Sequence, residues 1–390
     1  MDIREKILTS DLPTPCYVID EEKLVKNCQI LKDVQDRTGC KILLAQKAFS
    51  NYDLYPVIKP FLAGTEASGL FEARLGSEKM PDSECHVFCA AYRDDEFDEL
   101  LKYADHIVFN SPTQLVKFGI RAKAAGKEIG LRINPEHSTQ EGHEIYDPCA
   151  VGSRLGTTLL QWDELMSDSL IAMLDGLHFH TLCEQNSDAL EETLEAVEEK
   201  FGKFLYKMKW LNMGGGHHIT RDDYDISRLE KEILRISEKY NVQVYLEPGE
   251  AVALNAGYLL TEVLDVLRND KTDIAILDMS AACHTPDVIE MPYRPPLFKS
   301  DESGVLEYTY RLGGPTCLAG DIVGDYSFEK EIRVGDKLLF EDMAIYSTCK
   351  NNTFNGMPLP DIWKVDSEGV FRLLAHFGYD DFKYRLGSKN

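Results

Sequence analysis

The sequence predicts an α/β protein made of a (β/α)8 barrel and a smaller antiparallel β domain. Its 390 residues exceed what one ordinary small core needs, and 44% of them are hydrophobic, enough for a large buried interior. Short apolar runs alternate with helical patterns eight times in about 210 residues, which is typical of this barrel. After residue 255, strand-like runs follow one another between Gly and Pro turns, which indicates a separate β domain.

The barrel strands are expected where β-rich apolar runs lie between turn signals. They fall near residues 41–46, 65–69, 86–90, 106–109, 129–133, 175–181, 208–213 and 242–247. The intervening helices are expected over residues 52–62, 70–79, 94–103, 113–125, 159–168, 186–203 and 225–240. An open doubly wound sheet would also alternate, but it calls for a G-x-G-x-x-G turn after its first strand, and the chain has none there.

The β domain is expected to combine both ends of the chain. Its strands are predicted at residues 258–267, 274–279, 306–312 and 337–340. Cys16–Ile19 forms a further strand that precedes the barrel, so it can pair into the same sheet. The predicted domains are therefore a barrel over 21–255 and a β domain of 1–20 with 256–390, sharing a hinge near residues 20 and 255.

The composition excludes some classes of function. The formal net charge of −24 repels nucleic acid and anionic membranes and attracts cations such as a polyamine. The alternative interpretation is that this charge serves only to keep the protein soluble. Ten cysteines without a C-x-x-C pair favour a reducing cytoplasm. Met1–Lys6 lacks the apolar segment of a signal peptide, and no apolar run approaches the ~20 residues that span a bilayer, so we expect no membrane association.

The unusual residues follow the ends of the predicted strands, where barrels place their chemistry. Lys47 follows the first strand among apolar neighbours, and a desolvated lysine has a free amine that can form a Schiff base. Gly214–Gly216 follow the seventh strand, and consecutive glycines let backbone N–H groups approach a phosphate. Together these features imply pyridoxal 5′-phosphate (PLP). Glu247, after the eighth strand, would keep the pyridine nitrogen protonated, and His180 would lie on the ring face.

His178 and His180 lie two residues apart on one strand, so both side chains point to one face. His-x-His pairs also bind metals, but this pair lies on the sixth strand without obvious further ligands. We therefore predict no metal site and expect His178 to be a hydrogen-bonded interior residue. His217 and His218 follow the glycines and either line the site or cap a helix, and the helix cap is the favoured interpretation.

The order of these motifs resembles that of the fold type III PLP-dependent decarboxylases, the group of alanine racemase, ornithine decarboxylase and diaminopimelate decarboxylase. Within this family the chain looks closest to the branch that decarboxylates carboxynorspermidine and carboxyspermidine. The similarity spans essentially the whole chain. It is carried by the runs at 44–49 (LAQKAF), 178–184 (HFHTLCE), 211–218 (LNMGGGHH), 247–250 (EPGE), 286–293 (PDVIEMPY), 313–317 (GGPTC), 340–344 (FEDMA) and 354–356 (FNG).

The resemblance implies how the barrel residues bind the cofactor. Lys47 would hold PLP as a Schiff base, and His180 would stack on its ring. Glu247 would pair with the pyridinium, while Gly214, Gly215 and Gly216 would bind the phosphate. We therefore expect PLP as the cofactor and Lys47 and His180 among the catalytic residues.

Further roles implied by the resemblance fall on residues outside the barrel motifs. Tyr346 of the β domain would donate to a phosphate oxygen, and Arg154 is a looser match to a residue near the phenolic oxygen. Cys317 matches a cysteine that these decarboxylases bring in from the partner subunit to protonate the substrate carbon after carbon dioxide leaves. Asp321 of the same loop would pair with the substrate's distal ammonium. Because these two residues act across an interface, an obligate homodimer is implied.

One residue departs from the amino acid decarboxylases of the family. Ornithine and diaminopimelate decarboxylases carry an arginine where Glu250 stands. A glutamate would reject a substrate carboxylate and favour an amine, which is worth about an order of magnitude or more in selectivity. Glu250 and Asp287 are therefore candidates for binding the amines of a polyamine chain, and each could equally be a structural carboxylate.

Three other functions stay open at this stage. The first is a decarboxylase of ornithine, arginine or diaminopimelate on the same fold, against which Glu250 argues. The second is a metal-dependent hydrolase. The third is a regulatory relative without turnover, although such a homologue need not retain Lys47, His180, Glu247 and Cys317. The sequence does not separate carboxynorspermidine from carboxyspermidine, because one CH2 group changes affinity by only ~1–3 kcal/mol.

Overall fold

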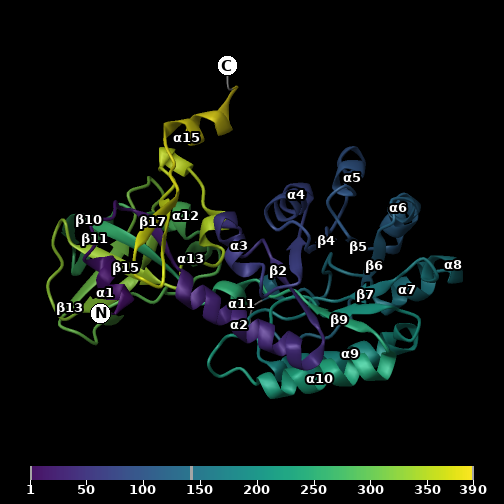
Figure 1. The fold of residues 1–390 in the computed structure, drawn as a ribbon. Helices are drawn as coiled ribbons and strands as arrows, with labels where there is room; N and C mark the ends of the chain where they lie inside the picture. Colours follow the sequence, from purple (N-terminus) through teal and green to yellow (C-terminus); the bar gives the residue numbers. More distant parts are fainter. Residues whose placement is uncertain (1, 141–143, 389–390) are drawn as a thin grey trace. The chain divides into compact units, whose positions relative to one another are not determined.

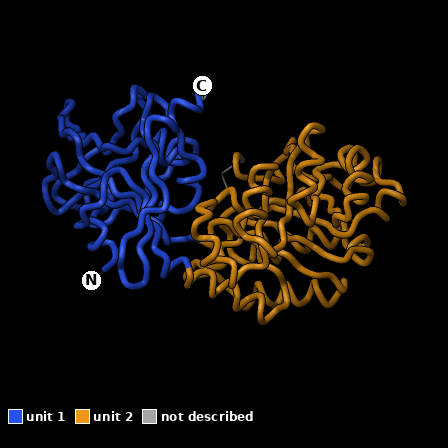
Figure 2. Tube along the Cα trace, turned by 45° about the horizontal axis from the view of Figure 1, so that its top comes forward, with its two compact units in different colours: residues 1–24, 253–390 blue, residues 25–252 orange. Residues whose placement is uncertain are grey.

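The computed structural model describes residues 2–140 and 144–388. The chain forms two compact units, residues 1–24 with 253–390 and residues 25–252, which are coloured separately in Figure 2. The chain thus passes between the units near Leu24 and Ala253, a few residues from the hinge positions expected at 20 and 255.

The second unit contains a closed barrel of eight parallel strands, so the predicted fold class is confirmed. Each strand pairs in parallel with the next, and the last one closes the ring against the first. All eight predicted strands are present, with ends shifted by a few residues. They are β2 (Lys41–Ala45), β3 (Gly64–Ala67), β4 (Glu84–Phe88), β5 (His106–Phe109), β6 (Glu128–Arg132), β7 (Gly176–His178), β8 (Trp210–Asn212) and β9 (Gln243–Leu246).

One large side chain fills much of the barrel interior. Trp210 on β8 is 2% exposed and packs with Tyr245 of β9. Glycines face it from two neighbouring strands, because a Cβ at Gly130 or Gly176 would lie 2.3 or 2.0 Å from an indole carbon. Glycine at these two positions is therefore required by packing, and the barrel is a solid core with its chemistry confined to the ends.

Helices surround the strands, with α4, α5 and α6 on one side of the barrel and α9 and α10 on the other in Figure 1. Six of the seven predicted helices match a helix of similar extent, while the segment expected at 52–62 is a short 3-10 turn and a single helical turn. The long helix α2 was not predicted. The helices are α2 (Glu21–Thr38), η1 (Tyr52–Leu54), α3 (Tyr55–Ile58), α4 (Leu70–Lys79), α5 (Asp94–Leu100), α6 (Pro112–Ala124), η2 (Glu144–Tyr146), α7 (Leu159–Leu165), α8 (Asp168–Ile171), α9 (Ser187–Leu205), α10 (Ile226–Tyr240) and α11 (Glu250–Ala253).

Helix α10 shows how the sequence specifies these elements. Its buried residues Leu229, Ile233 and Ile236 recur every three or four positions, which places them on one face. Asp225 caps its N-terminus by accepting from the Arg228 N–H. The pattern and the cap therefore fix both the inner face and the first residue of the helix.

The first unit contains a nine-stranded sheet in the order β12-β14-β13-β11-β10-β1-β16-β17, with β15 also paired to β10. The strand at Cys16 pairs into it as predicted. The sheet is mainly antiparallel, but β1 pairs with β16, and β11 with β13, in parallel. The strands are β1 (Cys16–Asp20), β10 (Gly257–Asn269), β11 (Thr272–Leu277), β12 (Asp301–Glu302), β13 (Tyr308–Gly313), β14 (Ile322–Phe328), β15 (Lys337–Glu341), β16 (Asp361–Val365) and β17 (Phe371–Ala375).

The core of this unit lies between β1, β10 and α1. Val18, Tyr258 and Leu260 are at most 1% exposed and belong to one apolar cluster with Ile7. Its helices are short, and they are α1 (Ile3–Leu8), α12 (Ala281–His284), α13 (Asp287–Glu290), α14 (Ser347–Lys350), η3 (Phe354–Gly356) and α15 (Tyr379–Leu386). Across residues 2–140 and 144–388, no helix is both long and apolar enough to cross a bilayer.

Candidate active site

Four of the predicted site segments meet at one end of the barrel. Parallel strands in a closed barrel all end on the same side, and Lys47, His180, Gly214–Gly216 and Glu247 follow β2, β7, β8 and β9. The Gly215 N–H donates to His180 Nδ1 (3.2 Å), and the Glu247 N–H donates to the Gly214 carbonyl (2.7 Å). The segments after β7, β8 and β9 are thus bonded to one another around the barrel mouth, which we define as the carboxyl ends of its strands.

Glu247 is a buried carboxylate held by neutral donors. It is 3% exposed, Oε1 accepts from Asn212 Nδ2 (2.6 Å), and Oε2 lies 3.1 Å from His178 Nε2. Burial raises the pKa of Glu247, but the electrostatic interaction and the hydrogen bond with His178 outweigh it, with smaller contributions from His86 and Lys47, so the pKa is lowered and the carboxylate is ionised. Burial lowers the pKa of His178, which favours the neutral imidazole. The interior, hydrogen-bonded position predicted for His178 is confirmed.

His180 is fixed by bonds to its ring and to its backbone. Its Nδ1 accepts from the Gly215 N–H, and its carbonyl accepts from the Arg132 guanidinium (3.0 Å). Burial lowers the pKa of His180 well below the usual value, and the charge of Lys47 lowers it further. The imidazole is therefore neutral and held in one orientation, as a group that covers a planar ligand must be.

The glycine segment packs tightly against the residues that follow β7. Gly214 and Gly216 have φ angles of +67° and +80°, and a Cβ at these positions would lie 2.4 and 2.0 Å from the carbonyl oxygens of Phe179 and Leu182. Glycine is needed here for both reasons. The Gly214 N–H donates to Asn212 Oδ1 (2.9 Å), so not every amide of the segment is directed to a ligand.

Lys47 is partly buried beside an acid that the sequence analysis missed. Glu66, on β3, is 2% exposed, and its Oε2 has no hydrogen-bond partner among residues 2–140 and 144–388. Burial raises the pKa of Glu66, and the charge of Lys47 offsets only part of that rise, so the neutral acid is favoured. The signal for Glu66 was a charged residue inside a strand whose other members, Gly64, Thr65 and Ala67, are small.

The buried arginine at the mouth is Arg132, which was also missed. It ends β6, is 5% exposed, and its guanidinium carbon lies 4.6 Å from the centre of the Phe88 ring. Burial lowers the pKa of Arg132 to about 10. Arg154, by contrast, is exposed in the segment after β6, where its carbonyl accepts from Asn110 Nδ2 (2.8 Å). The contact predicted for Arg154 therefore stays a prediction.

Glu250, His217 and His218 all follow the glycine segment in the sequence. Glu250 begins α11 and is 9% exposed, and His218 Nε2 lies 3.7 Å from its Oε2. His217 is buried, with Nε2 3.2 Å from the Met213 carbonyl oxygen. The interpretation of the histidines as a helix cap is wrong, because Asp225 caps α10.

Cys317 and Asp321 lie between β13 and β14 of the β unit. Cys317 is exposed, and its N–H donates to Asn355 Oδ1 (2.7 Å). Asp321 is 2% exposed, and its carboxylate accepts from the hydroxyls of Thr316 (2.7 Å) and Ser280 (2.9 Å) and from two backbone amides. An ionised carboxylate has about four acceptor positions. Those of Asp321 are thus largely used to hold the loop that presents Cys317.

Tyr346 and Asp287 are the remaining predicted residues of the β unit. Tyr346 precedes α14 with a φ of +57°, a conformation that is uncommon for a bulky residue and is often kept at functional positions. Asp287 begins α13 and pairs with Lys350, which also binds Glu290. A substrate amine at Asp287 would therefore compete with an internal lysine.

Comparison with known families agrees with this arrangement. The family model described as "Pyridoxal-dependent decarboxylase, C-terminal sheet domain" matches residues 16–344. The chain belongs to the pyridoxal-dependent decarboxylase family. The family resemblance carried by the motifs is thereby confirmed.

Two relatives of this decarboxylase match over nearly their whole length. The carboxynorspermidine/carboxyspermidine decarboxylase of Campylobacter jejuni is 41% identical over 385 residues, covering 96% of this chain and 98% of the relative. The carboxyaminopropylagmatine decarboxylase of Synechocystis sp. is 38% identical over 388 residues and 99% of each chain. The crystal structure of the Campylobacter jejuni carboxynorspermidine decarboxylase complexed with norspermidine has a TM-score of 0.88 and 40% identity, covering 96% of this chain and 100% of that one.

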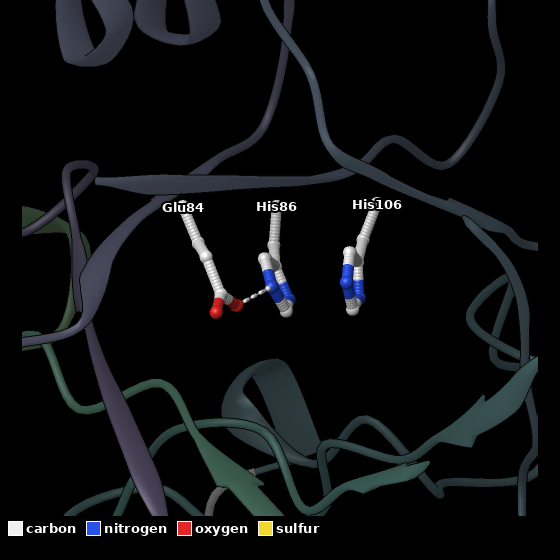
Figure 3. A group of neighbouring side chains, drawn as sticks. All are labelled: Glu84, His86 and His106. Carbon is white, nitrogen blue, oxygen red and sulfur yellow. Dashed lines mark hydrogen bonds and ion pairs between the residues drawn. The ribbon is translucent and has the colours of Figure 1, made fainter. Parts of the chain in front are cut away.

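A second polar group of this decarboxylase lies at the opposite end of the barrel, the amino ends of the strands. Figure 3 shows Glu84, His86 and His106 projecting side by side, with the two imidazoles face to face. The ring centres are 3.8 Å apart, and Glu84 Oε2 lies 3.1 Å from His86 Nε2. Lys41 pairs with Glu84 from the start of β2. Because residues at the amino ends of barrel strands usually serve stability, we assign this group to the fold.

Proposed function

We propose that the chain decarboxylates carboxynorspermidine and carboxyspermidine to norspermidine and spermidine in polyamine biosynthesis. The Campylobacter jejuni relative with this activity in its name supports the proposal at 41% identity over nearly the full length. The observation that carries the specificity is the buried carboxylate of Glu250, where the amino acid decarboxylases are expected to have an arginine. A carboxylate repels the second carboxylate of diaminopimelate and attracts a protonated amine.

We propose PLP as the cofactor at the barrel mouth, since the residues there fit it. Glu247 is a buried anion whose hydrogen bonds come from Asn212 and the neutral His178, and a buried charge is costly unless a cation faces it. A protonated pyridine nitrogen supplies that cation. When bound, PLP would withdraw electrons from the substrate bond that releases carbon dioxide.

The barrel residues would hold the cofactor in distinct ways. Lys47 would bind it covalently through Nζ, and Glu247 would keep a proton on the pyridine nitrogen. The neutral, fixed imidazole of His180 would cover the ring face. Gly214–Gly216 would contact the phosphate together with Tyr346. We propose residues 21–255 as the PLP-binding domain and residues 1–20 with 256–390 as the β domain.

The remaining predicted residues would act on the substrate. The Cys317 thiol would deliver a proton to the carbon from which carbon dioxide has left, in the site of a second subunit, so we propose a homodimer with active sites at the interface. Glu250, Asp287 and Asp321 are the proposed contacts of the substrate amines, and Arg154 the proposed neighbour of the phenolic oxygen. All ten cysteines are free thiols, which supports a cytoplasmic location.

The test is release of carbon dioxide by the purified, PLP-loaded protein. The substrates are carboxynorspermidine, carboxyspermidine, ornithine, arginine and meso-diaminopimelate, with Lys47→Ala as the blank. Turnover of the two carboxylated polyamines alone supports the proposal. Turnover of an amino acid instead would keep the family and discard the argument from Glu250, and no release at all would favour a non-catalytic homologue.

A second candidate is the decarboxylation of carboxyaminopropylagmatine. The Synechocystis relative with that name is almost as similar, at 38% identity. Its substrate carries a guanidinium, which buried carboxylates also attract. Adding carboxyaminopropylagmatine to the same assay separates the two candidates by their kcat/KM values.

A further inference from the structure

Two carboxylates and an imidazole come together at the barrel mouth. The ligating atoms of Glu184, His218 and Glu250 all lie within 4.8 Å of one another. Glu184 belongs to the segment after β7, His218 to the segment after β8, and Glu250 begins α11 after β9. Three separate segments, two loops and the start of α11, therefore contribute one acceptor group each to the same small volume.

Hydrogen bonds between these loops fix the arrangement. The His218 N–H donates to the Gln185 carbonyl (3.2 Å), so the residue next to Glu184 is tied to the segment after β8. Thr220 Oγ1 donates to the Ala251 carbonyl (2.7 Å), which joins that same segment to α11. Glu184 itself has a φ of +52°, a turn conformation uncommon outside glycine. Groups held in this way are preorganised for a ligand.

His218 is buried without a hydrogen-bond partner of its own. It is 7% exposed, and within residues 2–140 and 144–388 neither ring nitrogen has a hydrogen-bond partner. Its Nε2 faces the Glu250 carboxylate at 3.7 Å, which is too far for a hydrogen bond. Burial lowers the pKa of His218, and the charge of Glu184 offsets this only in part, so the ring is neutral and offers a lone pair. Because buried polar atoms are rarely left unsatisfied, these nitrogens point to a position that binds a ligand.

The electrostatic field at this cluster is negative. Burial raises the pKa of the neighbouring Cys183 to about 12, and the charges of Glu250 and Glu184 contribute to the rise. Arg221 is a cation of the same region, but its Nε binds Asp223 (2.5 Å), and its Nη1 donates to the backbone carbonyl of Glu184 (3.5 Å). The cluster therefore presents acceptors and negative charge, which favours a cation with several N–H donors.

We propose that Glu184, His218 and Glu250 form the subsite that binds a protonated amine of the substrate. The inference rests on the proposed function and extends it, since it adds Glu184 and His218 to Glu250 as specificity determinants. A protonated alkylamine has two or three N–H donors, which match one oxygen of each carboxylate and the free ring nitrogen. Charge-assisted hydrogen bonds of this kind are the strong ones in proteins.

The first experiment compares Glu184→Gln with Glu195→Gln in the PLP-loaded enzyme. Glu195 is an exposed residue of α9 outside the cluster, so its variant has the same change of charge. Losing one charge-assisted hydrogen bond should raise the KM for carboxynorspermidine by about 10-fold or more in Glu184→Gln, with little change in kcat. Glu195→Gln should leave both constants unchanged. His218→Asn should also raise the KM for carboxynorspermidine.

Two substrate analogues identify the amine. One has its terminal amine replaced by a methyl group, and the other has its internal amine replaced by a methylene. The analogue that lacks the bound amine should be processed equally by wild type and Glu184→Gln, whereas the other analogue should keep the full KM difference. Equal KM values for wild type and Glu184→Gln with every substrate would overturn the proposal.

Calorimetric binding of norspermidine to the PLP-loaded protein supplies a readout that needs no turnover. We expect its Kd to rise about 10-fold or more in Glu184→Gln and to stay constant in Glu195→Gln. If wild type released no carbon dioxide from any substrate, the proposed function would fail while this difference in Kd still tested the subsite. Stoichiometric divalent metal that is lost in Glu184→Gln, together with an unchanged Kd, would assign the cluster to a metal ion and overturn the proposal.

Discussion

Buried and partly buried acids have different partners at the two ends of the barrel. At the amino end, Asp175 lies just before β7 and binds Lys123 and Lys209, the latter at 2.9 Å. Glu84, at the same end, pairs with Lys41. Each of these acids is thus matched by a lysine of the same chain through a direct hydrogen bond or ion pair.

At the mouth, the acids are held by neutral groups instead. Glu247 accepts from Asn212 and a neutral His178, and in the described part of the chain Glu66 has an oxygen without a hydrogen-bond partner. His218 has two such nitrogens. Since unpaired buried charge and polarity destabilise a fold, the comparison indicates that the amino end serves stability while the mouth is built for ligands.

The largest expected effect comes from replacing the lysine at the mouth end of β2. Lys47→Ala should lower kcat by at least about 10³-fold, because no other residue at the mouth is proposed to hold the cofactor covalently. Borohydride reduction followed by mass spectrometry should detect no cofactor attached to this variant. Lys41→Ala, at the other end of the same strand, is the control and should keep the attachment. Reductive trapping of cofactor on Lys47→Ala would contradict the assignment.

Glu247→Gln separates function from stability at the mouth. Removing the carboxylate should lower kcat by about 10²–10³-fold, the usual effect of losing one preorganised electrostatic contact. The Tm of the cofactor-free protein should stay level or rise, because a buried anion without a cationic hydrogen-bond partner is replaced by a neutral amide. Differential scanning calorimetry with steady-state kinetics measures both. An equal fall of Tm in Glu247→Gln and Glu84→Gln would mean that the two ends do not differ.

The barrel was predictable because each strand is a short apolar run followed by a turn. Helix α2 was missed although Leu24, Cys28 and Leu31 recur at helical spacing. Their apolar stripe is narrow in a segment rich in Lys, Asp and Gln, so the segment was not counted among the helical patterns. In the β unit, β14 (Ile322–Phe328) was missed since glycine and charged residues interrupt its alternation.

The site was predictable only where a residue follows a strand within a recognisable motif. Lys47 and Glu247 do so, and parallel strand ends must converge. Glu184 and His218 lie close together because hydrogen bonds of Gln185 join the segment after β7 to the segment after β8. A single sequence does not reveal such pairing between loops. The hydrogen bonds that the Asp321 carboxylate accepts could not be predicted either, because its donors Ser280 and Thr316 lie on different segments.

Asp175→Asn tests the amino end with a smaller effect. Burial raises the pKa of Asp175, but hydrogen bonds from Lys123 and the Ile129 amide outweigh it and lower the pKa. Lys123 is partly exposed and Lys209 is exposed, so we expect a loss of about 1–3 kcal/mol in the free energy of unfolding. Urea denaturation measures this loss, and the kcat of the folded enzyme should be unchanged. A lower kcat at unchanged stability would mean that the amino end contributes to catalysis, contrary to the assignment of that end to stability.

The smallest effect is a pH dependence at Glu84. Burial alone would raise its pKa, but hydrogen bonds from His86 and Lys41 lower it to about 2, below the ~4.3 of an unfolded chain. A carboxyl group with a lowered folded pKa stabilises the fold above its unfolded pKa and loses that contribution as the pH falls toward the folded value.

Wild type should therefore exceed Glu84→Gln in unfolding free energy by about 1–2 kcal/mol at pH 6, because Lys41 is partly exposed. The difference should hold down to about pH 5 and shrink steadily between pH 4 and pH 2. Urea titrations across this range measure it, with Glu195→Gln as a matched exposed control. A difference that stays constant to pH 2 would show that Glu84 contributes through packing alone. The paired charges at the amino end would then no longer distinguish it from the mouth.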